Sequence, residues 1–135
     1  MRSPGAGWVF LCCFLCHCSL GASASEKAEA GQITRAIELL RDAPNAQKGA
    51  LLDGLKSASC AAPDLCELQR LCVDGYGQHV AALSETERAK ALVATGDAAE
   101  ASRALDYARS ELAEAAPKIA HCADAEGAAR RKYKP

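Results

Sequence analysis

The most regular hydrophobic pattern in this chain follows Gly96-Asp97. Apolar residues recur there at alternating steps of four and three residues, without a gap. They are Ala101, Leu105, Ala108, Leu112, Ala115, Ile119 and Cys122. Positions three and four apart share one face of an α-helix, so the pattern predicts a long helix. Pro117 falls inside it and predicts either a kink or the start of a further helix.

A second apolar face with the same spacing precedes that turn, in a helix that opens at Pro63-Asp64. Its positions are Leu65, Leu68, Cys72, Tyr76, His79 and Leu83. The face is lost where Ser84-Glu85-Thr86-Glu87 has the form of a capping box, which predicts a kink or a restart of the helix. Gly96-Asp97 suits the junction between two helices. The two segments are therefore predicted to form an antiparallel αα-hairpin.

Two shorter helices are expected earlier in the chain. The first runs from about Ser25, its N-cap, to Ala43, because Pro44 disfavours helical geometry in the residue before it. The second runs from Asn45 to about Ser57. After residue 24 the chain has 27 Ala and 12 Leu against three Val and three Ile, a composition that favours helix over strand. The predicted fold class is all-α: a small helical bundle built around the hairpin that turns at Gly96-Asp97.

Residues 1–24 have the features of a secretory signal peptide. Arg2 precedes an apolar run from Trp8 to Leu20, and Ala22-Ser23-Ala24 is a small-residue cleavage site. The run has about 13 residues, fewer than the roughly 20 that a membrane-spanning helix needs. We expect cleavage before Ser25, no membrane span after it, and a secreted or periplasmic protein. The expected organisation is a signal peptide (1–24), a helical domain (25–129) and a basic C-terminal tail (130–135) that frays.

The signal peptide also contains a candidate haem motif. Cys13-Phe14-Leu15-Cys16-His17 matches C-x-x-C-H, the attachment sequence for c-type haem. Haem attachment needs a folded site that the mature protein retains, and this segment is expected to be removed. We interpret the match as chance and expect no haem or other cofactor. Four of the eight cysteines leave with this segment.

The four remaining cysteines are Cys60, Cys66, Cys72 and Cys122, which allow three pairings. Cys66 and Cys72 are six residues apart on one predicted helix, about 9 Å along its axis, beyond the roughly 7 Å that a disulfide allows. Cys72 and Cys122 are each 25 residues from position 97, so they should face each other across the hairpin, while Cys60–Cys66 closes a short loop. The alternative, Cys60–Cys72 with Cys66–Cys122, stays open. The fold is thus predicted to be disulfide-stapled.

Charge and motifs exclude some functions. The mature chain has 15 basic and 17 acidic residues, a net charge of −2 that argues against nucleic-acid binding. The common nucleophile, phosphate-loop, zinc-protease and dinucleotide motifs do not occur. His79 with Tyr76 is a candidate general base, but both also suit the side of an amphipathic helix. We therefore expect no enzyme activity.

Three other groups of polar residues are candidates for chemistry. The carboxylates Glu100, Asp106, Glu111 and Glu114 are interpreted as a solvated helix face. A zinc cluster of His79, His121 and the cysteines is conceivable, but C-x5-C-x5-C lacks the close cysteine pair of structural zinc sites. The basic tail is interpreted as favourable charge at a helix C-terminus.

Two family resemblances are carried by the hairpin. Ala89, Gly96-Asp97, Ala101, Leu105 and Ala108 resemble one tetratricopeptide-type hairpin, although Glu85 and Arg88 replace apolar positions and no second copy follows. Another set looks like the second half of plant invertase and pectin-methylesterase inhibitor domains, secreted four-helix bundles with a helix-to-helix disulfide. Its members are Cys72, Tyr76, Val80, Leu83, Gly96-Asp97, Ala101, Leu105, Ala108 and Cys122. The span between the cysteines is longer here, and the N-terminal cysteine pair of that family is missing.

These observations lead to one expectation of function and two alternatives. The expected protein is an exported, non-enzymatic helical bundle that binds an unidentified protein partner or serves structurally in the cell envelope or secreted fraction. The first alternative is an inhibitor of a secreted enzyme. The second is a metal- or haem-binding bundle. The sequence leaves the oligomeric state open.

Overall fold

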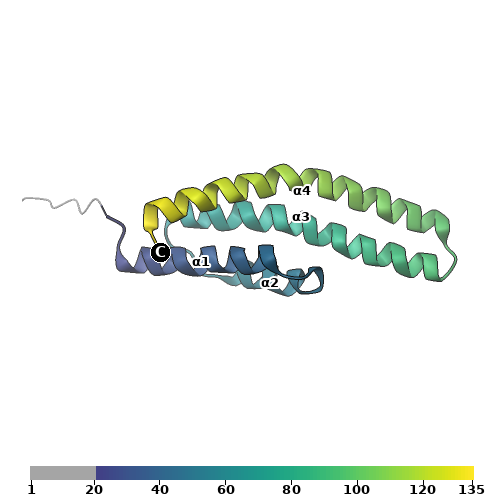
Figure 1. Ribbon diagram of the computed structural model, residues 1–135, viewed down its shortest axis with the longest axis horizontal. Coiled ribbons are helices and arrows are strands. Elements are labelled where there is room, and N and C mark those ends of the chain that lie inside the picture. Colours follow the sequence, from purple (N-terminus) through teal and green to yellow (C-terminus); the bar gives the residue numbers. More distant parts are fainter. Residues whose placement is uncertain (1–20) are drawn as a thin grey trace, which may run out of the picture.

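The computed structural model describes residues 21–135, which form four helices and no strand within that range. They are α1 (Ala24–Asp42), α2 (Asn45–Ser57), α3 (Pro63–Ala94) and α4 (Ala98–Tyr133). Figure 1 shows α3 and α4 as a long antiparallel hairpin, with the shorter α1 and α2 alongside the half that lies away from its turn. The all-α bundle built around a hairpin is therefore confirmed.

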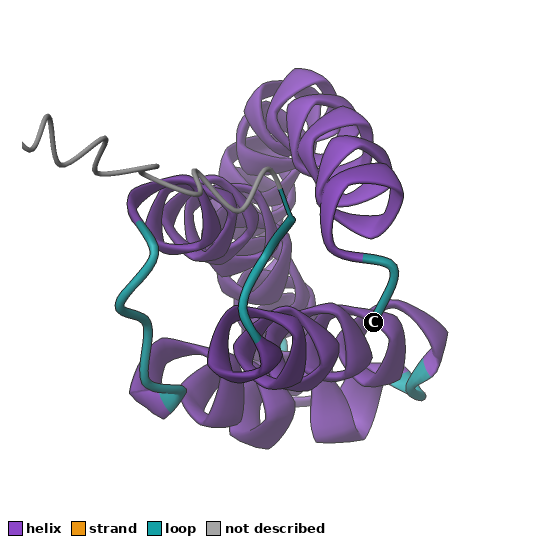
Figure 2. Ribbon diagram, turned by 90° about the vertical axis from the view of Figure 1, so that its left-hand side faces the viewer, coloured by secondary structure: helices purple, strands orange, loops and turns teal. Residues whose placement is uncertain are grey.

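The helices form two layers. α3 and α4 make the most extensive contact, α1 packs against α3 and α4, and α2 packs against α1 and α3. Figure 2 shows the α1 and α2 layer lying across one side of the α3–α4 pair. The turn between the long helices lies at Gly96-Asp97, as predicted: Gly96 has a φ of +85°, which favours glycine, and the Asp97 side chain accepts a hydrogen bond from the Glu100 amide at 3.1 Å.

The hydrophobic core lies where the two layers meet. It contains side chains from every helix, and its largest fully buried members are Ile33, Ile37, Leu40, Leu55, Leu65, Leu68, Cys72, Cys122 and Tyr133. The turn end of the hairpin has a different interior, made of the buried alanines Ala82, Ala89, Ala101, Ala104 and Ala108. Small side chains let the two helices approach closely there, but they bury little apolar area.

Both long helices are uninterrupted. α3 continues through Ser84, so the helix does not restart there; Ser84 is exposed, and the Thr86 hydroxyl donates a hydrogen bond back to the Ala82 carbonyl oxygen at 2.8 Å. α4 continues through Pro117, which is also exposed. At Gly75 the helices are so close that an added Cβ would lie 2.9 Å from the Ile119 backbone nitrogen.

The C-terminal segment is part of the domain, so the prediction that it frays is wrong. α4 runs to Tyr133, whose side chain is fully buried, and Lys134 ends the helix in the left-handed conformation. The Tyr133 hydroxyl donates a hydrogen bond to one Asp64 carboxylate oxygen at 2.7 Å, and Lys132 donates to the other at 2.7 Å. The last turn of α4 is thereby attached to the first turn of α3.

The start of α1 also differs from the expectation. Its N-cap is Ser23, not Ser25: the Ser23 hydroxyl accepts a hydrogen bond from the Glu26 amide, and the Glu26 carboxylate accepts one from the Ser23 amide. Ala22 packs against the core. The remainder of the predicted signal peptide, including Arg2 and the C-x-x-C-H motif, lies outside the described residues.

Two disulfide bonds join the same pairs that the cysteine spacing favours. Cys72 of α3 and Cys122 of α4 are bonded with their Cα atoms 4.8 Å apart, and both are buried in the core. Cys60 and Cys66 are bonded with their Cα atoms 5.2 Å apart and attach the loop after α2 to the start of α3. Because disulfides form in oxidising compartments, these bonds are consistent with a location outside the cytoplasm.

Candidate functional site

The candidate general base lies in a packed part of the fold. Tyr76 is buried between the layers, and His79 is partly buried near α2. Burial and the nearby charge of Lys48 hold the pKa of His79 below its ordinary value, which favours the neutral imidazole. Lys48 is itself buried and donates hydrogen bonds to the carbonyl oxygens of Leu40 and Arg41, which end α1. This group of residues therefore fixes the corner between α1 and α2.

The predicted carboxylate face is a row of separate pairs. Glu100 accepts hydrogen bonds from Arg88 and Arg103, and Asp106 accepts one from Arg109. Glu114 accepts one from Gln78. A hydrogen bond to Glu111 raises the pKa of Tyr107 above its ordinary value. The carboxylates are therefore distributed along α4, and they do not converge on one point.

The conceivable zinc ligands do not come together either. All four cysteines after residue 24 are in disulfides, and His121 is exposed on α4. Within residues 21–135, no group of three or more His, Cys, Asp or Glu side chains is placed to hold a metal ion.

One buried charged group has no signal in the sequence. The side chain of Glu126 is only 4% exposed, and it accepts hydrogen bonds from Arg41 of α1 and from Arg130. Arg130 also donates to Glu38 at 2.7 Å. These contacts hold α1 against α4. Glu126 could not be singled out from the sequence, because a single acidic residue on a predicted helix looks the same whether it is buried or solvated.

The part of the hairpin that α1 and α2 leave uncovered is the candidate functional site. We call this part, residues 84–112, the arm. Figure 1 shows it extending past the α1–α2 corner to the turn at Gly96. Its two helices are held together by the buried alanines and by the hydrogen bond of Arg88 to Glu100 at 2.6 Å. The core and the Cys72–Cys122 disulfide lie in the other half of the hairpin, so the arm is a projection from a covalently fixed base.

One side of the arm is apolar, and we call it the apolar face. Val93 and Leu105 line a shallow groove of about 330 Å³ there, together with Thr86, Ala89 and Lys90. Val93 is 64% exposed, Leu105 is 38% exposed, and Leu112, two turns after Leu105, is 43% exposed. Large apolar side chains gathered and exposed on a small domain are typical of a surface that another molecule covers.

The other side of the arm is charged. Glu85 and Arg88 of α3 and Arg103 and Tyr107 of α4 line a second groove, of about 280 Å³. Arg88 donates hydrogen bonds to Glu85 at 3.0 Å and to Glu100 at 2.6 Å, so these charges are already paired within the chain. The arm therefore presents two chemically different faces.

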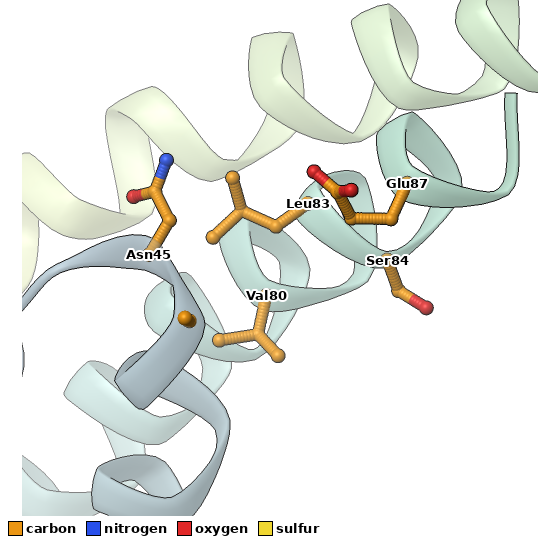
Figure 3. Close-up of a pocket in the computed structure, with 6 residues that line it drawn as sticks. Asn45, Val80, Leu83, Ser84 and Glu87 are labelled. Carbon is orange, nitrogen blue, oxygen red and sulfur yellow. The ribbon is translucent and has the colours of Figure 1, made fainter. Parts of the chain in front are cut away.

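The apolar face is the continuation of the surface that α2 covers. Next to the arm, Val80, Leu83, Ser84 and Glu87 of α3 share a pocket of about 500 Å³ with Asn45 and Ala46 at the start of α2. Figure 3 shows Val80 and Leu83 extending from α3 toward the corner where Asn45 lies. Lys90 follows Leu83 by two helical turns on the same side of α3. The surface thus passes from covered at Val80 to uncovered at Lys90 and Val93.

The sequence pattern includes two residues of this site, but it does not show that they are exposed. Leu105 and Leu112 belong to the predicted apolar face of α4, yet both are exposed, whereas Ala101, Ala108 and Ala115 of the same pattern are buried. The exposure of this site could have been inferred from helix length, because α1 and α2 are too short to cover the whole hairpin.

The comparisons with known proteins give no further information on this site. No family model, curated protein or solved structure matches the chain. Within the part of the chain that the structure describes, no helix has both the length and the apolar character needed to cross a membrane. The fold and the surface together define a small, disulfide-stapled helical bundle with a projecting two-helix arm.

Proposed function

We propose that this chain is an exported, non-enzymatic helical module that binds a protein partner through the apolar face of its arm. The observation that carries the proposal is the exposure of Val93, Leu105 and Leu112 on one side of a projecting hairpin. Covering such side chains contributes about 25 cal/mol per Å² of apolar area removed from water, and the entropy cost of association offsets part of this gain. The Cys72–Cys122 disulfide supports the role, since a fixed base lowers the entropy lost when the arm binds.

Export is the second part of the proposal. The two disulfides support an oxidising compartment, and the leader-like residues 1–24 support secretion or transfer to the periplasm with cleavage before Ser25. N-terminal sequencing and mass spectrometry of the exported protein test this part. A sequence starting at Ser25 and two intact disulfides are expected. Retention of Met1, or four free thiols, would contradict it.

Photo-crosslinking in intact exporting cells tests the binding surface. A photoreactive amino acid placed at Val93 should give a discrete crosslinked product of higher mass. The same group placed at Tyr107, which is 53% exposed on the charged face, is the matched control and should give little of this product. Equal products from both positions, or none from Val93, would contradict the proposal. Capture of a secreted enzyme whose activity falls on binding would instead support the inhibitor alternative.

A further inference from the structure

We infer that the partner covering the apolar face is the arm of a second copy of this chain, in an antiparallel pair related by a two-fold axis. The inference rests on the proposed function, and it names the occupant of the same surface. Where α1 and α2 cover the hairpin, four helices pack together; along the arm only two are present. A second arm supplies the two missing helices, with the same length as the surface it has to cover.

Two charged residues of α3 have a spacing that suits this two-fold axis, because opposite charges of the two copies then lie near each other. Glu87 and Lys90 lie on the side of α3 that continues the covered surface, with side chains 70% and 67% exposed, and within one chain Lys90 donates a hydrogen bond to Glu87 at 2.6 Å. In an antiparallel pair of identical helices, residues at equal distances before and after the axis face each other. The part of α3 in the arm is Ser84–Ala94, so the axis crosses it at its midpoint, residue 89. The midpoint of Glu87 and Lys90 lies only half a residue from that position. Each Glu87–Lys90 pair therefore faces the same pair of the second copy in the opposite order, so each Glu87 lies near the Lys90 of both copies.

The same register brings the turn of one copy to the α1–α2 corner of the other. With the axis near residue 89, Leu83 lies within one helical turn of Val93 in the second copy, so two apolar side chains meet. The pocket of about 500 Å³ that Leu83 shares with Asn45 then faces the turn at Gly96 of the second copy. An added Cβ at Gly96 would contact nothing within 4 Å, so the turn is free to approach. Each arm thus ends where the short helices of the other copy begin.

The small area of the contact limits the dimer to a weak, reversible one. The part of α3 in the arm is about 16 Å long at 1.5 Å per residue, and two adjacent helices are about 20 Å wide. This gives about 300–400 Å² per copy, less than the roughly 800 Å² per partner of a typical stable complex. We therefore expect monomers at low concentration and dimers at high concentration.

Sedimentation equilibrium of the oxidised protein over a wide concentration range tests the dimer. Val93→Glu should raise the dissociation constant at least tenfold, because it places a carboxylate in the apolar contact with Leu83 of the second copy. Tyr107→Glu on the charged face is the matched control and should leave the constant unchanged. Leu105→Glu provides a second variant of the apolar face, and circular dichroism checks that all three remain helical. A dimer that both apolar-face variants leave unchanged would overturn the inference.

A charge exchange tests the register. Glu87→Lys alone places two lysines opposite each other in the dimer, and Lys90→Glu alone places two glutamates opposite each other, so each variant should dimerise less. An equimolar mixture of the two variants should form heterodimers more strongly than either variant forms homodimers, since opposite charges then meet at both positions. Native mass spectrometry separates the three species when one variant is isotopically labelled. A mixture with no preference for the heterodimer would overturn this register.

The result also separates this inference from the proposed function. Protein that remains monomeric at all concentrations, while a crosslinker at Val93 in cells captures a different protein, would overturn the second copy as occupant and leave the binding role intact. Monomeric protein with no crosslink from Val93 would overturn both. A crosslinked product with twice the mass of the chain supports both. Its yield should fall when the second copy carries Val93→Glu.

Discussion

Glu126 of α4 accepts a hydrogen bond from Arg41 at the end of α1, although the two residues are 85 positions apart in the sequence. Arg130 donates to the same carboxylate and to Glu38, so one buried acidic side chain organises a charged contact between the two layers. A buried carboxylate without its partners would carry a large desolvation cost, so these contacts hold α1 in a defined position.

Replacing Glu126 should be costly. Glu126→Ala leaves two guanidinium groups facing a partly buried space, and we expect a loss of about 1–3 kcal/mol in the free energy of unfolding. This is less than a fully buried pair would cost, since the side chains of Arg41 and Arg130 are 43% and 40% exposed. Glu114→Ala, an exposed glutamate on the same helix, is the control and should change stability little. Urea unfolding measures both, and equal losses would contradict the structural role of Glu126.

The close approach of the long helices predicts opposite effects for two glycines of α3. Gly75→Ala should destabilise the protein by about 1–3 kcal/mol, because the new Cβ would lie 2.9 Å from the Ile119 backbone nitrogen. Gly77→Ala should stabilise it by up to about 1 kcal/mol, because nothing lies within 4 Å and alanine favours helix. Thermal unfolding compares the two variants. A stable Gly75→Ala protein would show that the helices can separate locally.

The two disulfides should contribute unequally. Replacing Cys72 and Cys122 together with Ala should cost about 2–5 kcal/mol, since their bond closes a loop of 51 residues and both side chains lie in the core. Replacing Cys60 and Cys66 together should cost about 2 kcal/mol or less, because their loop contains only seven residues. Non-reducing peptide mapping identifies the pairing, and urea unfolding gives the costs. A Cys66–Cys122 peptide would contradict the structure.

The C-terminal attachment should be sensitive to acid. Burial alone would raise the pKa of Asp64, but hydrogen bonds from Lys132 and Tyr133 outweigh it and hold the pKa below its ordinary value of 3.8. A carboxyl whose pKa is lower in the folded state stabilises the fold above its unfolded pKa, and this contribution is lost as the pH falls through the folded value. Wild type should therefore lose more stability than Asp64→Asn between about pH 5 and pH 2. Parallel pH profiles would contradict this.

Removing the buried hydroxyl at the same attachment gives a pH-independent test. Tyr133→Phe leaves the ring in the core but removes the donor to Asp64, so we expect a loss of about 1 kcal/mol at neutral pH. Tyr107→Phe is the matched control, because Tyr107 is exposed on the arm and should tolerate the change. Denaturant unfolding followed by circular dichroism measures both.

The cap of α1 depends on a residue before the predicted cleavage site. In a chain that begins at Gly21, Ser23→Ala should cost about 1 kcal/mol, because it removes the oxygen that accepts the Glu26 amide hydrogen bond. Ser25→Ala, two positions later in the same turn, should cost less. If the mature chain begins at Ser25, the Ser23 cap is absent, and α1 should fray over its first turn.

The hairpin and its disulfides were predictable from sequence because each has a regular spacing. The steps of three and four define the two helices, and Cys72 and Cys122 are equally distant from Gly96-Asp97. The turn could be located from local chemistry alone, since glycine followed by a capping aspartate suits very few other positions. Neither Ser84 nor Pro117 starts a new helix, because packing along a long hairpin outweighs a local capping or proline signal.

The candidate site could not be predicted because periodicity identifies a face but not what covers it. Leu105 has the spacing of a core residue, yet α1 and α2 end before they reach it. The burial of Glu126 and Tyr133 could not be predicted for the opposite reason. A lone acidic residue and a tyrosine in a basic tail both look solvated until the tertiary contacts are known.

The attachment of Tyr133 to Asp64 has a consequence for biosynthesis. Tyr133 occupies the core beneath the start of α3, 69 positions earlier. When α1, α2 and α3 have been synthesised, the side chain that completes their packing is still missing. The core therefore closes only after the last turn of α4 has joined it. Until then the chain stays open, and an open chain remains a substrate for any translocation machinery that accepts only unfolded polypeptides.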